Sequence, residues 1–133
     1  MEHQEALIYT MVLVSAADSD MTDAELHRIG EIVSYLPAFK GYDRKNLTKT
    51  AADCAKLLDD ANGLEKALAA IKNALPDKLR ETAYALACDV VAADGKASQE
   101  ELRLLEMIRH RLEVGRLPAA AIERGARARH MSA

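Results

Sequence analysis

The sequence contains no tryptophan and a single phenylalanine among its 133 residues, and only three prolines and six glycines interrupt it. Aromatic side chains are typical of strands, whereas the apolar residues here are mainly Ala, Leu, Val, Ile and Met, a set that favours helices. A chain of this length, half of it hydrophobic, is within the usual size of one domain and can form a sizeable core. We therefore predict one all-α domain that spans residues 1–133.

Cysteines and long apolar runs are also scarce. Cys54 and Cys88 stand alone in helix-like segments without Cys-x-x-Cys spacing, which predicts two small core residues and no disulfide framework. No apolar run approaches the roughly 18 to 20 residues that span a bilayer, and the first residues lack the basic segment of a signal peptide. The expected location is the cytoplasm, without membrane insertion.

The net charge of −3 is modest but unevenly distributed. From Arg103 onward there are seven Lys/Arg and three Asp/Glu, or +4, whereas the first 102 residues carry eleven and eighteen, or −7. The basic end has no interleaved aromatic residues and no DNA-reading motif, so nucleic-acid binding is not predicted. A solvated helix end is the simpler interpretation.

Motifs of nucleotide binding and of catalysis are missing. The sequence contains no Walker loop, no Gly-x-Gly-x-x-Gly and no Gly-x-Ser-x-Gly, and its four histidines lack metalloprotease spacing. A hydrolase that uses paired carboxylates is a third hypothesis, but no nucleophile accompanies those acids. The sequence therefore predicts a binding module and not an enzyme.

Apolar residues recur at helical spacing in about seven segments. The expected helices run from Glu5 to Asp18, from the Thr22 cap to Pro37, from near Asp43 to Leu58, from Asn62 through Ile71, from Pro76 through Val91, from the Ser98 cap to Leu112, and over a short segment from Pro118. Short turns join them, which predicts a compact helical bundle. Met11 and Met107 are candidates for the border of an interaction groove.

An acidic turn occurs twice. Residues 16–26 and 92–102 align without a gap, 76 positions apart (92 minus 16). Both contain Ala-Ala-Asp, a hydroxyl residue four positions after the Asp, and Glu-Leu three positions later. Thr22 with Glu25 and Ser98 with Glu101 are the pairs expected of capping boxes, which start helices. The repeat predicts two pseudo-repeated helix-turn-helix units.

Asp18 and Asp94 each follow an apolar helical stripe. An acid at the carboxyl end of a helix is unfavourable by roughly 0.3 to 1 kcal/mol unless the next helix start, an Arg or Lys, or a metal ion offsets it. Carboxylate oxygens without a nearby Cys select Ca²⁺ or Mg²⁺ over Zn²⁺. The spacing is not that of an EF-hand, since the sixth position from Asp18 is Asp23 and the twelfth is Ile29. Capping and turn formation alone are the structural alternative.

The two turns resemble the TerB-like domain of tellurite-resistance proteins, which also occurs at the amino end of some membrane-anchored J-domain chaperones. The stronger match is the stretch 90–95, followed by Ser98 and Glu101, and the resemblance spans about Glu5 to Leu112. It implies a compact helical domain with an acidic, cation-binding surface. It also implies that the domain is not a catalyst but part of a stress-response assembly, which can be a peripheral membrane assembly.

The resemblance implies metal ligands in both turns: Asp18, Asp20, Glu25, Asp94 and Glu101. Where the first turn has Asp20, the second has Lys96, which removes a ligand and adds a competing cation. One asymmetric site centred on Asp18, Asp20 and Asp94 is therefore expected. The leading hypothesis is a module that binds Ca²⁺ or Mg²⁺, or presents negative charge to a protein partner. The alternative is a metal-independent adaptor that binds its partner through a helix groove.

Overall fold

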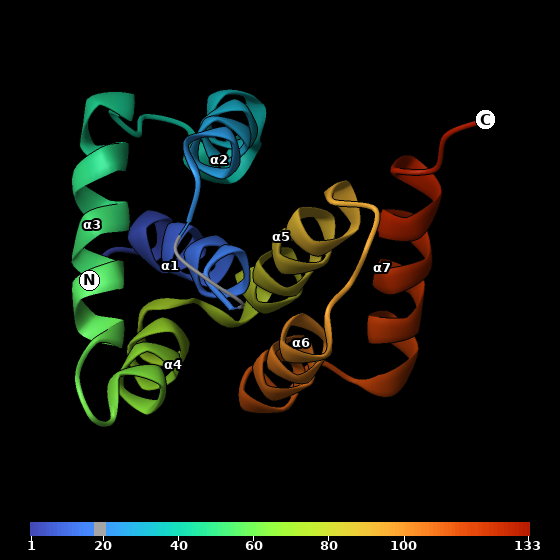
Figure 1. Cartoon of the computed structure of the whole chain (residues 1–133). Coiled ribbons are helices and arrows are strands. Elements are labelled where there is room, and N and C mark those ends of the chain that lie inside the picture. Colours follow the sequence, from blue (N-terminus) through green and yellow to red (C-terminus); the bar gives the residue numbers. More distant parts are fainter. Residues whose placement is uncertain (18–20) are drawn as a thin grey trace.

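The computed structural model describes residues 1–17 and 21–133, and in those residues it contains helices and 3₁₀ turns but no strand. Its α-helices are α1 (His3–Ser15), α2 (Asp23–Tyr35), α3 (Leu47–Leu58), α4 (Gly63–Ala74), α5 (Arg80–Ala93), α6 (Gln99–Arg111) and α7 (Arg116–Arg129) (Figure 1). The predicted all-α fold of about seven helices is confirmed.

Helix α1 forms the centre of the domain. All of its side chains from Ala6 to Ser15 are buried, and it packs against α3, α4, α5 and α6. A helix that is apolar on all sides is stable only when other elements surround it. The fully buried Thr10 hydroxyl donates to the Ala6 carbonyl at 2.8 Å. The Ser15 hydroxyl at the end of the helix is also buried and has no hydrogen-bond partner among the described residues.

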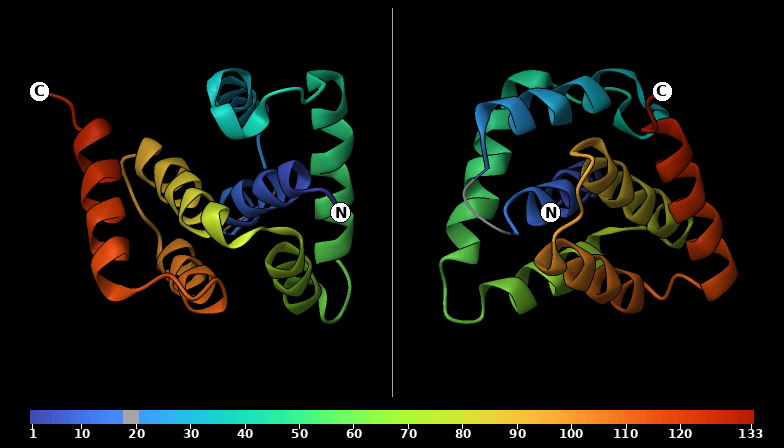
Figure 2. Two further views of the ribbon diagram at one scale, coloured as in Figure 1. Left: turned by 180° about the vertical axis from the view of Figure 1, so that it is seen from behind. Right: turned by 45° about the vertical axis from the view of Figure 1, so that its right-hand side comes forward.

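The later helices form a layer to one side of α1. Helix α5 packs against α1 and also against α7, which lies at the edge of the molecule opposite α3 in both views of Figure 2. Helix α6 packs against α5, but among the described helices α6 and α7 scarcely contact each other. Helix α5 therefore carries α6 and α7 as two separate neighbours.

Two helices begin later than the sequence predicts. Helix α3 starts at Leu47, because the Asp43 carboxylate accepts the backbone N–H of Lys45 at 3.0 Å and caps a 3₁₀ turn, Arg44–Asn46, first. Another 3₁₀ turn, Asp77–Leu79, stands between Pro76 and the start of α5. In both places a tighter turn replaces the first turn of the expected α-helix.

The other boundaries differ less. Helix α1 ends at Ser15, before the predicted end at Asp18. Helix α7 begins at Arg116, so that Pro118 lies within its first turn, where no intrahelical N–H is needed. This last helix extends to Arg129 and is longer than the short segment predicted.

The two cysteines are core residues, as predicted. Cys54 and Cys88 are buried and do not form a disulfide, and burial raises the pKa of each thiol to about 12. Both are therefore protonated and weakly reactive near neutral pH. Within the described residues, none of the helices combines the length and the apolar character needed to cross a membrane.

Candidate functional site in the acidic turns and the adjoining cleft

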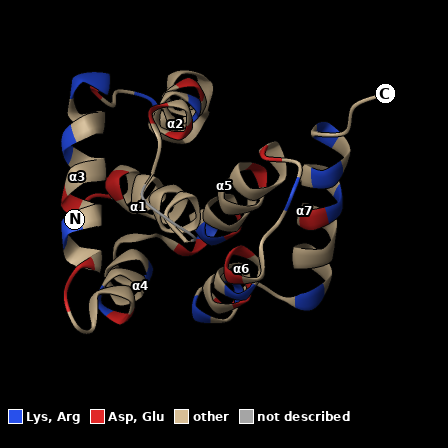
Figure 3. Cartoon of the chain, in the orientation of Figure 1, with Lys and Arg blue, Asp and Glu red and all other residues tan. Residues whose placement is uncertain are grey.

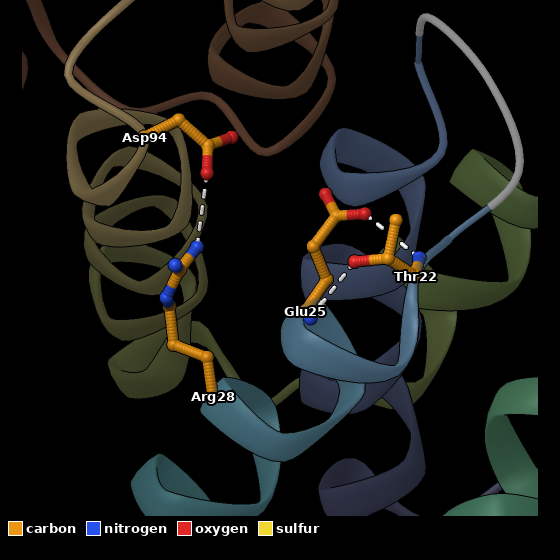
Figure 4. A network of polar contacts seen from close by, with 4 residues as sticks. All are labelled: Thr22, Glu25, Arg28 and Asp94. Atoms are coloured by element: carbon orange, nitrogen blue, oxygen red, sulfur yellow. Dashed lines mark hydrogen bonds and ion pairs between the residues drawn. The ribbon is translucent and has the colours of Figure 1, made fainter.

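The first acidic turn leads into a capping box. The Thr22 hydroxyl accepts the backbone N–H of Glu25 at 3.1 Å, and the Thr22 N–H donates to Glu25 Oε1 at 2.8 Å (Figure 4). The two bonds satisfy orphan N–H groups at the start of α2. One oxygen of Glu25 is thus engaged by the backbone, as the sequence predicts.

The second acidic turn repeats this arrangement. Ser98 Oγ accepts the N–H of Glu101 at 3.0 Å, and the Ser98 N–H donates to Glu101 Oε1 at 2.9 Å. Glu101 is only 5% exposed. Its burial and its bond to the backbone show that the Glu101 carboxylate serves as part of the cap of α6.

Asp94 lies directly after α5 and is paired with Arg28 from α2. The distance from Arg28 Nη1 to Asp94 Oδ1 is 3.0 Å, and the two side chains are 34% and 36% exposed. The guanidinium supplies the positive charge that an acid at the carboxyl end of a helix requires. A pair this exposed contributes about 0 to 1 kcal/mol, so its main consequence is geometric: the end of α5 lies beside α2.

The ion pair joins the second acidic turn to α2, the helix that follows the first acidic turn. Figure 4 shows the Asp94 carboxylate directed toward Arg28 and the Glu25 carboxylate directed back toward the backbone of Thr22. Asp18 and Asp20 lie outside the described residues. Within residues 1–17 and 21–133, no three His, Cys, Asp or Glu side chains are grouped closely enough to hold a metal ion. The metal site remains a prediction.

A cleft beside the second acidic turn was not predicted from the sequence. It has a volume of about 790 Å³ and lies between α5, α6 and α7, where Val91, Leu102 and Ala126 contribute apolar surface and Lys96 and Arg127 contribute charge. The available sequence signal was Leu102, which follows the buried Glu101 and is 47% exposed. Its exposure depends on how α7 is placed, which periodicity does not reveal.

The suggested groove methionines have different positions. Met107 borders a smaller hollow of about 540 Å³ with Leu68 from α4, whereas Met11 is fully buried in the core. Met107 therefore borders a hollow whose role as an interaction groove stays a prediction, and the suggestion is wrong for Met11. Met11 lies on α1, every side of which is covered by other helices.

Two polar groups of the larger cleft are hydrogen-bonded to each other. The Tyr84 hydroxyl donates to Glu123 Oε2 at 2.6 Å, and burial together with this bond raises the pKa of Tyr84. Cys88, also in the cleft, is protonated at neutral pH for the reason given above. Neither Cys88 nor Tyr84 is therefore an activated nucleophile.

Comparison with known proteins identifies the family of this domain. Residues 4–124 match the family described as tellurite resistance protein TerB. No curated protein and no solved structure matches the chain. The family match covers both acidic turns and all helices from α2 to α6. By this match over most of its length, the chain belongs to the TerB family of tellurite resistance proteins.

Proposed function

We propose that this domain is a cytoplasmic, non-catalytic binding module that holds a protein partner within a tellurite- or stress-response assembly. The observation that carries the proposal is the open cleft of about 790 Å³ between α5, α6 and α7. A concave apolar surface with a few polar groups is the usual form of a binding site. Membership of the TerB family supplies the biological setting.

The chemistry of the cleft also favours binding over catalysis. Its thiol and its phenol retain their protons at neutral pH, and its Glu123 is bound by the Tyr84 hydroxyl. A catalytic acid or base needs a pKa near the working pH and a free approach to substrate. The groups in this cleft instead offer shape, apolar surface and fixed charge.

Leu102→Asp should impair the module, because it places a charge in the apolar part of the cleft. In cells that lack the gene for this chain, we expect the Leu102→Asp variant to lower survival on tellurite toward that of cells without the protein. Leu117→Asp is the matched control, since Leu117 is 81% exposed on α7 and lies outside the cleft. It should support survival as the unaltered chain does.

Colony counts on tellurite measure this difference, and circular dichroism checks that both variants are folded. Equal survival with the two variants would contradict a role for the cleft. Failure of the unaltered chain to support survival would contradict the proposed setting.

A second candidate function is weak binding of Ca²⁺ or Mg²⁺ at the acidic turns. The observation that favours it is the approach of Asp94 to α2 through the Arg28 ion pair. Arg28 holds the position of a counter-ion, so a metal ion would compete with it for the Asp94 carboxylate. Asp18 and Asp20 are the further ligands that this hypothesis needs.

This competition makes a specific prediction about Arg28→Ala. Removal of the guanidinium should strengthen Ca²⁺ binding and enlarge the rise in melting temperature that Ca²⁺ produces. An ion present at about 100 times its Kd stabilises a folded domain by about 2.7 kcal/mol. Asp94→Asn should abolish the rise, whereas Arg124→Ala, an exposed arginine on α7, should leave it as in the unaltered chain. If neither Ca²⁺ nor Mg²⁺ changes the melting temperature of any of these variants, the domain has no such site.

A further inference from the structure

The floor of the cleft is one face of helix α5. Tyr84, Cys88, Val91 and Ala92 line it at positions i, i+4, i+7 and i+8, the spacing of a single helical face. The eight steps from Tyr84 to Ala92 extend over roughly 12 Å of helix. Helices α6 and α7 pack against α5 but scarcely against each other, so they form two walls with a groove between them. A groove with a helical floor and two helical walls suits another helix.

Exposed apolar side chains gather at this groove. The described residues expose few large apolar side chains, and two of them, Leu102 at 47% and Met131 at 64%, line the cleft. Leu105 on α6 and Ala126 on α7 also line the cleft, but they are only 9% and 2% exposed. An exposed apolar patch inside a concave surface marks an interaction site more specifically than a scattered leucine does. The occupant must therefore present an apolar stripe.

The charged side chains at the groove are mixed but mostly basic, since Lys96, Arg109 and Arg127 line it together with Glu106 and Glu123. Lys96 precedes α6 and Arg127 lies on α7, and neither forms an ion pair or a hydrogen bond with another described residue. The acidic Glu123 is engaged by the Tyr84 hydroxyl. Figure 3 shows Lys and Arg along α7 and on the segment that joins α5 to α6, and the chain from Arg103 onward carries a net +4. Acidic residues beside the apolar stripe of a partner would complement these cations.

We infer that the groove between α5, α6 and α7 binds an amphipathic helix of a partner protein, with an apolar stripe against Val91, Leu102 and Leu105 and acidic residues toward Lys96 and Arg127. This inference rests on the proposed function and gives the partner a chemical description. The apolar stripe provides the buried area, while the acidic flank selects this helix over a basic one.

Two synthetic peptides test the charge of the partner on the intact 133-residue chain. Both are fluorescein-labelled 18-residue peptides designed as helices, with leucines at i, i+3, i+4 and i+7. The remaining faces combine alanine with glutamate in one peptide and alanine with lysine in the other, because alanine favours the helix and separates like charges. In fluorescence anisotropy we expect the acidic peptide to bind at least tenfold more tightly than the basic one, with an affinity that falls as salt increases.

Charge reversal locates the binding. Lys96→Glu/Arg127→Glu should lower the affinity for the acidic peptide at least tenfold and raise the affinity for the basic peptide. Lys78→Glu/Arg116→Glu is the matched control, because it makes the same change in net charge at an exposed lysine and arginine outside the cleft, and Arg116 stands eleven residues before Arg127 on α7. The control should leave the affinity of the acidic peptide within about twofold, since distant exposed charges are largely screened.

Several outcomes would overturn the inference: no binding of either peptide, equal binding of both, or an equal loss in the control variant. Binding of dodecanoate or of anionic phosphatidylglycerol vesicles without any peptide binding would also overturn it, in favour of a lipid. If survival on tellurite depends on Leu102 while no acidic peptide binds, this description of the partner is wrong and the proposed function stands.

Discussion

Leu7→Ala should lower the free energy of unfolding by about 2 to 5 kcal/mol, the range for truncation of a buried leucine. Leu7 is fully buried in α1, the helix that contacts α3, α4, α5 and α6. Its truncation leaves a cavity in the middle of the domain, and because neighbours pack on every side of α1, no single helix can move to fill it. Each kcal/mol corresponds to roughly 3 to 6 °C in melting temperature for a domain of this size.

Urea unfolding followed by circular dichroism at 222 nm measures the loss. Leu117→Ala is the control, because this leucine is 81% exposed and its truncation should change stability by less than about 0.5 kcal/mol. A loss below 1 kcal/mol in Leu7→Ala would show that α1 is not the centre of the core. A change in m-value would instead show that the mutation alters the compactness of the unfolded or the native state, or that unfolding is no longer two-state.

The starts of two helices were predictable from the sequence because their rules are local. Thr22 and Ser98 each have a Glu three residues later, and α2 and α6 begin directly after these two hydroxyl residues. Both capping boxes form as predicted, with reciprocal bonds to the backbone. A rule that involves four consecutive residues needs no knowledge of tertiary structure.

The predicted starts of α3 and α5 lie several residues before the observed starts, because local patterns do not define the type of the first turn. Near Asp43 and Pro76 the sequence supports a turn, but the periodicity of apolar residues does not distinguish a 3₁₀ turn from the first turn of an α-helix. The Asp43 side chain binds the N–H of Lys45, two residues later, and this short bond favours the tighter turn. Sequence patterns define the body of a helix better than its ends.

The environment of Asp94 could not be predicted, because its partner is distant in sequence. Arg28 precedes it by 66 residues and reaches it only because α2 lies beside the end of α5. The sequence did predict that an acid at this position needs a compensating charge, and an arginine was one of the alternatives. Which alternative applies depends on tertiary structure. The cleft depends on tertiary structure too, since three helices contribute to it.

The cleft gives a reason for the difference between the two turns. The first turn has Asp20 where the second has Lys96, and Lys96 lines the cleft beside α6. An acid there would place negative charge at the basic side of the proposed helix-binding groove. The two turns share the capping boxes that start α2 and α6, but the second also contributes to a surface that involves α7. On this interpretation the repeat is structural, and the departure from it is functional.

Gly63→Ala should destabilise the domain by about 3 kcal/mol, although alanine is the better helix former. Gly63 is the first residue of α4 and follows a tight connection from α3, in which its N–H donates to the Asp60 carbonyl at 3.0 Å. A Cβ atom on Gly63 would overlap the Leu57 carbonyl oxygen and lie 2.8 Å from Leu58 Cα. These are backbone atoms at the end of α3, so relief of the overlap requires α3 and α4 to separate. Overpacking usually costs 1 to 3 kcal/mol.

Gly125→Ala provides the matched control, because it makes the same chemical change within a helix. The nearest atom to an added Cβ there is Arg129 Nη1 at 3.3 Å, the end of a flexible side chain. Helix propensity should then dominate, and the domain should gain about 0.5 to 1 kcal/mol. Thermal unfolding of the two variants should therefore shift in opposite directions. A gain in stability for Gly63→Ala would mean that α3 and α4 do not approach this closely, because propensity alone would then decide the effect.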